Sequence, residues 1–133
     1  MDNKLLLVDD EEGIRKVLGI ALSDAGYTVF SAKNGEEALK IFRKETPPIV
    51  LTDIKMPGMD GISVCKELKK DKELKEIPVI FITARTGTHD KLEGFNVGAA
   101  DFLVKPLNLE EAHARVKTQL RIIEEHKANL MLT

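Results

Sequence analysis

Short apolar runs alternate with amphipathic segments along this chain, and that alternation constrains its fold more than any other feature. The runs are continuous in Val, Ile and Leu, as in strands of a parallel sheet that are buried on both faces. Strand and helix alternate five times, which predicts a parallel sheet with helices on both faces. The right-handed crossover rule leaves few topologies for such a sheet. The expected strands lie near residues 5–8, 27–30, 49–51, 78–82 and 101–104.

Turn and capping residues mark the ends of the helices between these strands. The stretch 34–37, Asn-Gly-Glu-Glu, resembles a capping box, and Asn108 with Glu111 forms a second one. Asp60 can cap another helix, and Gly26 ends the first. The first helix is expected to pack one apolar face on the sheet, with five residues at helical spacing. These residues are Ile14, Val17, Leu18, Ala21 and Leu22.

Composition narrows the class of protein. A chain of 133 residues can bury the core of one domain without disulfides, and its single Cys65 excludes an intramolecular one. Twenty basic and twenty-two acidic residues give a net charge of -2, so direct nucleic-acid binding is not expected. The sequence lacks an apolar signal segment and a run long enough to span a bilayer. We therefore expect a cytoplasmic protein without a membrane partner.

Polar residues follow four of the five predicted strands. Parallel strands gather their carboxyl ends at one rim, which is where ligands bind in open α/β sheets. Three clustered carboxylates would raise one another's pKa unless a cation neutralised them. An oxygen-rich site of this kind suits Mg²⁺ or Mn²⁺ with several waters retained. The residues are Asp9 and Asp10, Asp53, Thr83 and Lys105.

A cation alone leaves the hydroxyl of Thr83 and the ammonium of Lys105 unexplained. A phosphoryl group supplies the missing partner, because its oxygens need a metal, an ammonium and a hydroxyl as charge develops on them. Asp53, ionised at neutral pH, can attack phosphorus in line and become an aspartyl phosphate. Asp9 and Asp10 would hold the metal. On its own, Asp53 could also be a residue that caps a loop.

These residues match the motif of a known family. Asp9-Asp10, Asp53 within Leu-Thr-Asp-Ile-Lys-Met-Pro-Gly-Met-Asp-Gly, Thr83-Ala84 and Lys105-Pro106 together resemble the receiver domain of two-component response regulators. The resemblance covers residues 4 to about 122. It implies an α/β fold, a single doubly wound, flavodoxin-like parallel sheet of five strands in the order 2-1-3-4-5. It also implies five helices, of which the last is extended.

The resemblance assigns roles to the acidic residues. Asp53 would be the phosphoacceptor. Asp10, Asp53 and the backbone carbonyl of Lys55 would bind Mg²⁺ or Mn²⁺ directly, and Asp9 would bind through a water. Lys55 and Arg85 stand where side chains tune phosphoryl lifetime in the family.

The resemblance also assigns the phosphoryl-binding and switch residues. Thr83, the backbone of Ala84, and Lys105 would bind the phosphoryl oxygens. Thr83 and Phe102 would form the switch, with Phe102 the residue at which the family varies most. The peptide bond between Lys105 and Pro106 would be cis.

Partners follow from the same resemblance. The phosphoryl group would come from a histidine of a sensor histidine kinase or phosphotransfer protein, and the chain's own His89, His113 and His126 are interpreted as solvated. Output would use the face built from the fourth helix, fifth strand and fifth helix, where a partner or a second copy would bind. Receiver residues would be 1–122, with 123–133 extending the last helix as a frayed tail or a dimerising signalling helix. Apolar residues recur there every seven positions, at Leu109, Val116, Ile123 and Leu130.

Three other functions compete with this interpretation. A haloacid-dehalogenase-type phosphatase would need a strand-end Asp-x-Asp and a cap segment, and the sequence has neither. In a flavodoxin-like nucleotide binder, the acidic run 9–12 would repel phosphate without a metal. A degenerate receiver, acting as a phosphorylation-independent docking module, would be expected to lack one of the motif residues, whereas all are present. Labelling by a small-molecule phosphodonor separates the switch from the docking module.

Overall fold

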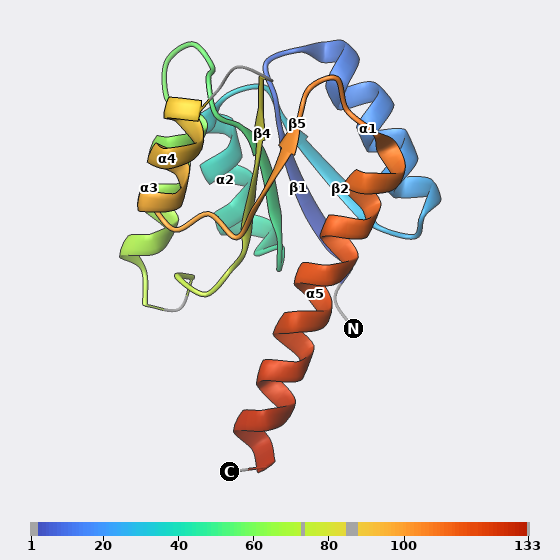
Figure 1. The fold of residues 1–133 in the computed structure, drawn as a ribbon, viewed down its shortest axis with the longest axis vertical. Coiled ribbons are helices and arrows are strands. Elements are labelled where there is room, and N and C mark those ends of the chain that lie inside the picture. The colour runs from blue at the N-terminus through green and yellow to red at the C-terminus, as the bar shows by residue number, and fades with distance from the viewer. Residues whose placement is uncertain (1–2, 73, 85–87, 133) are drawn as a thin grey trace.

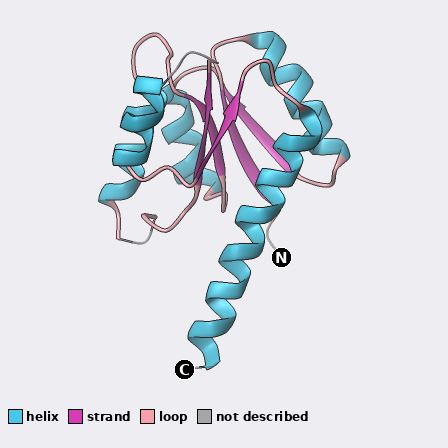
Figure 2. Ribbon diagram, in the orientation of Figure 1, coloured by secondary structure: helices cyan, strands magenta, loops and turns pink. Residues whose placement is uncertain are grey.

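The computed structural model describes residues 3–72, 74–84 and 88–132. Arg85 lies outside these residues, as do the side chains of His89 and Leu130. The strands form one five-stranded sheet in the order β2-β1-β3-β4-β5, and every neighbouring pair is parallel (Figures 1 and 2). This confirms the predicted fold and strand order. The strands are β1 (Lys4–Val8), β2 (Thr28–Ala32), β3 (Val50–Asp53), β4 (Val79–Thr83) and β5 (Asp101–Val104).

Helices cover both faces of the sheet. Two of them, α1 and α5, lie side by side on one face, and the other three cover the opposite face (Figure 1). The parallel connections require this arrangement, because each crossover must return over one face of the sheet. The helices are α1 (Glu12–Asp24), α2 (Gly35–Glu45), α3 (Gly61–Lys70), α4 (Thr88–Asn96) and α5 (Leu109–Leu132).

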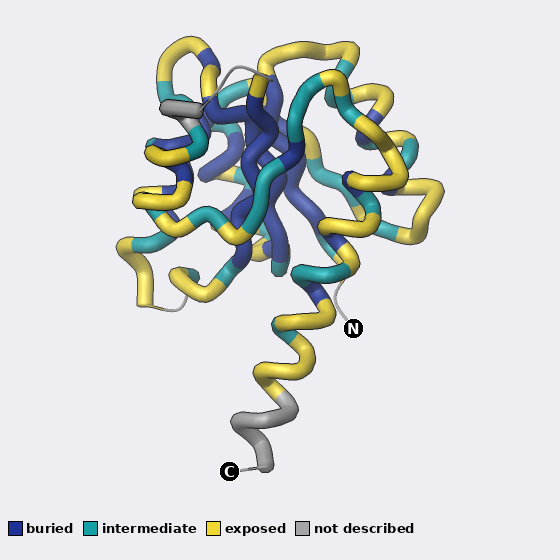
Figure 3. Tube along the Cα trace, viewed as in Figure 1, coloured by how far each residue is buried: buried dark blue, intermediate teal, exposed yellow. Residues whose placement is uncertain are grey.

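Alternate residues of each central strand enter two separate apolar clusters. Leu5 and Leu7 of β1 pack with α1 and α5, whereas Leu6 and Val8 pack with α2 and α3. All four side chains are fully buried, and Figure 3 shows the central strands as the buried middle layer of the molecule. The period of two along a strand explains why a continuous apolar run was needed. Packing in these two clusters thus fixes the register of neighbouring strands, and the register determines which residues lie at the carboxyl ends of the strands.

The predicted capping residues begin the helices where the sequence placed them. Asn34 accepts a hydrogen bond from the Glu37 N–H at 2.9 Å at the start of α2. The Glu37 carboxylate accepts from the N–H of Lys33, so the box does not close on Asn34. At its other end, α2 stops at Thr46 in the left-handed conformation, with φ 44° and ψ 55°.

The first helix departs from its predicted burial. Leu18 and Leu22 are buried against the sheet, but the Val17 side chain is 56% exposed, and so is 54% of Ile20. The prediction that Val17 faces the sheet was therefore wrong. Because α1 meets the sheet along one narrow stripe and has only α5 beside it, side chains next to that stripe stay in solvent.

The last helix runs past the edge of the sheet. Val116 and Leu120 of α5 are buried in the core, whereas residues 124–127 are exposed (Figure 3). Figure 1 shows the end of α5 projecting below the strands. Among the described residues, no helix combines the length and apolar character that crossing a membrane requires.

Candidate functional site

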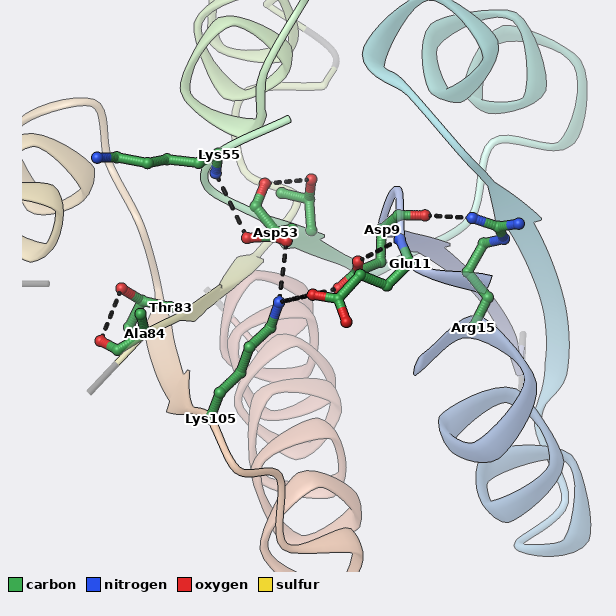
Figure 4. Close-up of polar contacts among 9 residues, drawn as sticks. Asp9, Glu11, Arg15, Asp53, Lys55, Thr83, Ala84 and Lys105 are labelled. Atoms are coloured by element: carbon green, nitrogen blue, oxygen red, sulfur yellow. Dashed lines mark hydrogen bonds and ion pairs between the residues drawn. The ribbon is translucent and has the colours of Figure 1, made fainter. Parts of the chain in front are cut away.

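The carboxyl ends of four strands meet at one rim of the sheet, where the predicted polar residues lie. Asp53 is the last residue of β3, and Thr83 is the last of β4. Asp9 directly follows β1, and Lys105 directly follows β5. Figure 4 shows these side chains converging from their separate strands. A cavity of about 240 Å³ opens between them, lined by Asp10, Asp53, Thr83 and Lys105 among others.

The turn after β3 holds Asp53 in place through a close backbone approach. The Gly61 N–H donates to the Ile54 carbonyl at 3.0 Å, which brings the start of α3 against the end of β3. A Cβ at Gly61 would collide with the Asp53 carbonyl oxygen, so only glycine fits. The Thr52 hydroxyl donates to the same carbonyl at 3.0 Å. These contacts hold the backbone at Asp53 and Ile54 in place, and with it the starting point of the Asp53 side chain.

Three carboxylates form a compact acidic cluster. Carboxylate oxygens of Asp9, Asp10 and Asp53 all lie within 4.8 Å of one another. Asp9 is fully buried, Asp53 is 7% exposed and Asp10 is exposed. Burial raises the pKa of Asp53 above its ordinary value, although the Lys105 ammonium opposes that rise. The cluster therefore combines buried anions with one carboxylate that is open to solvent.

Only one of the two carboxylate oxygens of Asp9 accepts a hydrogen bond from a described residue. Its Oδ1 accepts the Glu11 N–H at 2.9 Å, while its buried Oδ2 has no hydrogen-bond partner among the described residues. The pKa of Asp9 is raised to about 6, mainly by burial; the Glu11 N–H opposes this rise, and the Asp53 charge adds to it. An orphaned carboxylate oxygen beside two more carboxylates fits a hard divalent cation such as Mg²⁺.

Lys105 is the cation that the protein itself supplies. Its Nζ lies 3.1 Å from Asp53 Oδ2 and 3.0 Å from Glu11 Oε1, with Asp9 Oδ2 at 3.8 Å (Figure 4). Burial lowers the pKa of Lys105, but its bonds to Glu11 and Asp53 outweigh burial and raise it overall. The ammonium therefore stays charged. The peptide bond from Lys105 to Pro106 is cis.

The remaining predicted residues divide between the cavity and the outside. Thr83 is buried, and its hydroxyl lies 3.4 Å from the Ala84 carbonyl oxygen. The Lys55 N–H donates to Asp53 Oδ1 at 3.4 Å. Phe102 does not reach the cavity. It is half-buried on β5, with its ring edge-on to Phe95 at a centroid distance of 4.7 Å.

Sequence reasoning missed two residues of the site. Glu11 binds Lys105, and the guanidinium of Arg15 donates to the Asp9 carbonyl at 2.7 Å, which anchors the loop after β1. Glu11 belongs to the acidic run that directly follows β1, and Arg15 stands one helical turn further on. That proximity was the available signal, but four successive acids do not show which one turns inward.

A larger cavity lies elsewhere. About 750 Å³ opens between Tyr27 and α5, and it contains none of the predicted site residues. His113 borders it and packs edge-on against Tyr27 at a centroid distance of 5.7 Å. His113 is thus half-buried, and the interpretation of it as a solvated residue was incomplete. Of these two cavities between described residues, the smaller is the functional candidate because it brings together the carboxylates, the hydroxyl and the ammonium.

The chain is similar in sequence and in structure to known proteins. A family model described as "Response regulator receiver domain" matches residues 5–117. The "Probable transcriptional regulator ycf27" of Porphyridium aerugineum is 42% identical over 126 residues, covering 95% of this chain and 51% of that protein. The "Alkaline phosphatase synthesis transcriptional regulatory protein PhoP" of Bacillus subtilis is 42% identical over 121 residues, covering 91% and 50%. The chain thus spans about half the length of these curated relatives.

The fold also matches a solved structure closely. The chemotaxis response regulator CheY4 of Vibrio cholerae superposes with a TM-score of 0.83 at 34% sequence identity. That match covers 90% of this chain and 99% of the solved one. Sequence and structure therefore point to the same family.

Proposed function

The chain belongs to the response regulator receiver domain family of two-component systems, and on that premise we propose that it is a phosphorylation-dependent signalling switch. Asp53 is the proposed phosphoacceptor. The observation that carries the proposal is the contact of Asp53 with Lys105 at 3.1 Å, inside a cluster of three carboxylates at the sheet rim. A purely structural ion pair would not need the two further carboxylates beside it.

The proposed reaction moves a phosphoryl group from a histidine of a sensor kinase or phosphotransfer protein to Asp53. A carboxylate oxygen of Asp53 forms the new O–P bond as the P–N bond of the donor breaks. The electron pair of that bond stays on the imidazole nitrogen of the donor. Lys105 pairs with a phosphoryl oxygen, and Thr83 and the backbone N–H of Ala84 donate hydrogen bonds to others. No general base is needed, because an ionised Asp53 is already the nucleophile.

The acidic cluster fits a divalent cation, which would be Mg²⁺ or Mn²⁺. Asp10, Asp53 and the Lys55 carbonyl would bind it directly, and Asp9 would bind it through a water. When bound, the cation neutralises charge on the phosphoryl oxygens as the transfer proceeds. Its presence would also stabilise the ionised forms of Asp9 and Asp53, whose pKa values burial raises.

Output is proposed to use the surface formed by α4, β5 and α5. Thr83 would move toward the phosphoryl group and Phe102 would turn inward, which biases a two-state surface. Support comes from Phe102 packing on Phe95, since Leu92 and Phe95 are both 60% exposed on α4. A partner or a second copy would bind there. Both curated relatives compared above are named as transcriptional regulators, so we propose control of transcription as the output of the protein in which this receiver acts.

The test is metal-dependent labelling of Asp53. With acetyl phosphate and Mg²⁺, intact mass should rise by one phosphoryl group, and excess chelator should abolish the gain. Asp53→Asn should stay unlabelled. Asp10→Ala should weaken Mg²⁺ binding at least tenfold because it removes a direct anionic ligand.

Two controls sharpen this experiment. Glu12→Ala removes an acid from the same run but leaves the proposed ligands intact, so its Mg²⁺ affinity should stay close to that of the wild type. Labelling that persists in Asp53→Asn or in chelator contradicts the assignment. A wild type that never labels, yet still binds a partner through α4, β5 and α5, would be the docking module.

A further inference from the structure

Glu11 lies against the ammonium that the proposed function requires for phosphoryl binding. A lysine ammonium has three N–H donors. Two of them face Asp53 Oδ2 at 3.1 Å and Glu11 Oε1 at 3.0 Å. The Asp9 Oδ2 atom, at 3.8 Å, is beyond hydrogen-bond distance. Figure 4 shows Glu11 reaching from the loop after β1 to Lys105.

Capping of α1 does not explain why a glutamate stands at this position. Glu11 is the N-cap residue of α1, yet its side chain makes no capping hydrogen bond. Asn, Asp, Ser and Thr are the residues that cap helices well at this position. The backbone of Glu11 is held at both ends, because its N–H donates to Asp9 and its carbonyl accepts from the Arg15 N–H. The fixed backbone leaves the side chain free to extend to Lys105.

The three members of this contact differ in their freedom to move. The Glu11 side chain is 60% exposed, whereas the side chains of Lys105 and Asp53, taken without their backbone, are 23% and 10% exposed. Glu11 can therefore swing into water, while Lys105 and Asp53 stay in place. An ion pair with one exposed partner is weak, so its release is easy.

A phosphoryl group on Asp53 and the Glu11 carboxylate would compete for the same ammonium. Both are anions, so they would repel each other when they approach the same ammonium. We propose that Glu11 is a resting-state clasp on Lys105, which withholds the ammonium from phosphoryl oxygens until Glu11 swings away. The clasp rests on the proposed function, and it makes Glu11 a positioning residue that acts through Lys105.

The test compares Glu11→Gln with Glu12→Gln, which removes the same charge from the next residue, an exposed one. Beryllofluoride, which mimics the phosphoryl group, is titrated against both variants at saturating Mg²⁺. Glu11→Gln should bind it roughly three- to tenfold more tightly, as expected for removing one charge close to an anion in a partly exposed site. Its labelling rate by acetyl phosphate should rise by a similar factor. Glu12→Gln should stay within about twofold of the wild type.

A second readout needs neither metal nor phosphodonor. In metal-free protein, the NMR signals of the Lys105 side chain should shift in Glu11→Gln and stay in place in Glu12→Gln. The clasp is overturned if Glu11→Gln binds beryllofluoride as the wild type does, binds it more weakly, or is matched by Glu12→Gln. If the wild type takes up neither label nor beryllofluoride, the proposed function fails and the clasp falls with it. The Lys105 signals then still report whether Glu11 holds the ammonium.

Discussion

Asp9 lies in an environment that disfavours its own negative charge. It is fully buried, one carboxylate oxygen lacks a hydrogen-bond partner among the described residues, and its pKa is raised to about 6. The unfolded chain would release that proton near 3.8. Between these values the folded state holds more protons than the unfolded state, so this group's contribution to stability is lost as pH rises through about 6.

Asp9→Asn should therefore stabilise the metal-free protein at high pH. In chelator, the difference in unfolding free energy between Asp9→Asn and wild type should grow as pH rises from about 4 to 7, reaching about 3 kcal/mol for the shift from 3.8 to about 6. Urea unfolding across that pH range measures it. Saturating Mg²⁺ should shrink the difference, because the cation compensates the buried charge. A difference that stays flat with pH would contradict the raised pKa.

For single residues, the sequence predicted which side chains reach the rim of the sheet better than it predicted which of them contact one another. Apolar runs ending in Asp53, Thr83 and Lys105 were enough to bring those residues to one rim, because parallel strands align their ends. The partnership of Glu11 with Lys105 could not be predicted, since the two lie 94 residues apart and the run of acids offered four candidates. Side-chain direction at the end of a strand depends on the loop backbone, which apolar periodicity does not encode.

Among the elements, α2 is followed by a C-cap residue, Thr46, whose backbone conformation is unfavourable for threonine. Thr46 is in the left-handed region at φ 44°, where β-branched residues are strongly disfavoured, and it precedes Pro47. Its N–H nevertheless donates to the Phe42 carbonyl at 2.8 Å and satisfies the end of the helix. Glycine and asparagine are the residues that occupy this position at little cost.

Thr46→Asn should accordingly raise the unfolding free energy by about 0.5–1 kcal/mol. The midpoint of urea unfolding should increase with an unchanged denaturant slope, since the exposed Thr46 side chain buries little surface. Thr46→Ala is the control, because it also removes the branched side chain but lacks the amide by which asparagine forms local hydrogen bonds in the left-handed conformation. Equal gains from both variants would locate the effect in the side chain and not in the backbone conformation.

For each element, apolar periodicity predicted correctly whether the segment is a helix or a strand, but it predicted only in part which side chains are buried. It predicted every strand and helix, yet it also predicted that Val17 would face the sheet, and Val17 is mostly exposed. The sequence of one helix shows which of its side chains form an apolar face, but it does not show how much of that face the neighbouring elements cover. That coverage depends on α5, which lies beside α1 and comes from the far end of the chain.

For the molecule as a whole, the free end of α5 separates two interpretations of the extension. Residues 124–127 are exposed and contribute little to the core, so deleting everything after Ile123 should change the unfolding free energy by less than about 0.5 kcal/mol. Asp53 labelling should also be unchanged. Sedimentation with and without beryllofluoride completes the measurement. A dimer that the deletion abolishes would identify a signalling helix, and a constant monomer would identify a frayed tail.

The reach of α5 has a mechanical consequence. The helix starts four residues after Lys105, at the rim, and its 24 residues span about 36 Å. It is clamped to the sheet at Val116 and Leu120 and projects freely beyond them. A rotation of the helix about its buried contacts with the core would therefore move its far end most. A tilt of about 5° would displace its tip by roughly 1 Å for every 12 Å of unsupported length. A small tilt of α5 on the core would in this way become a larger displacement at the far end of the helix.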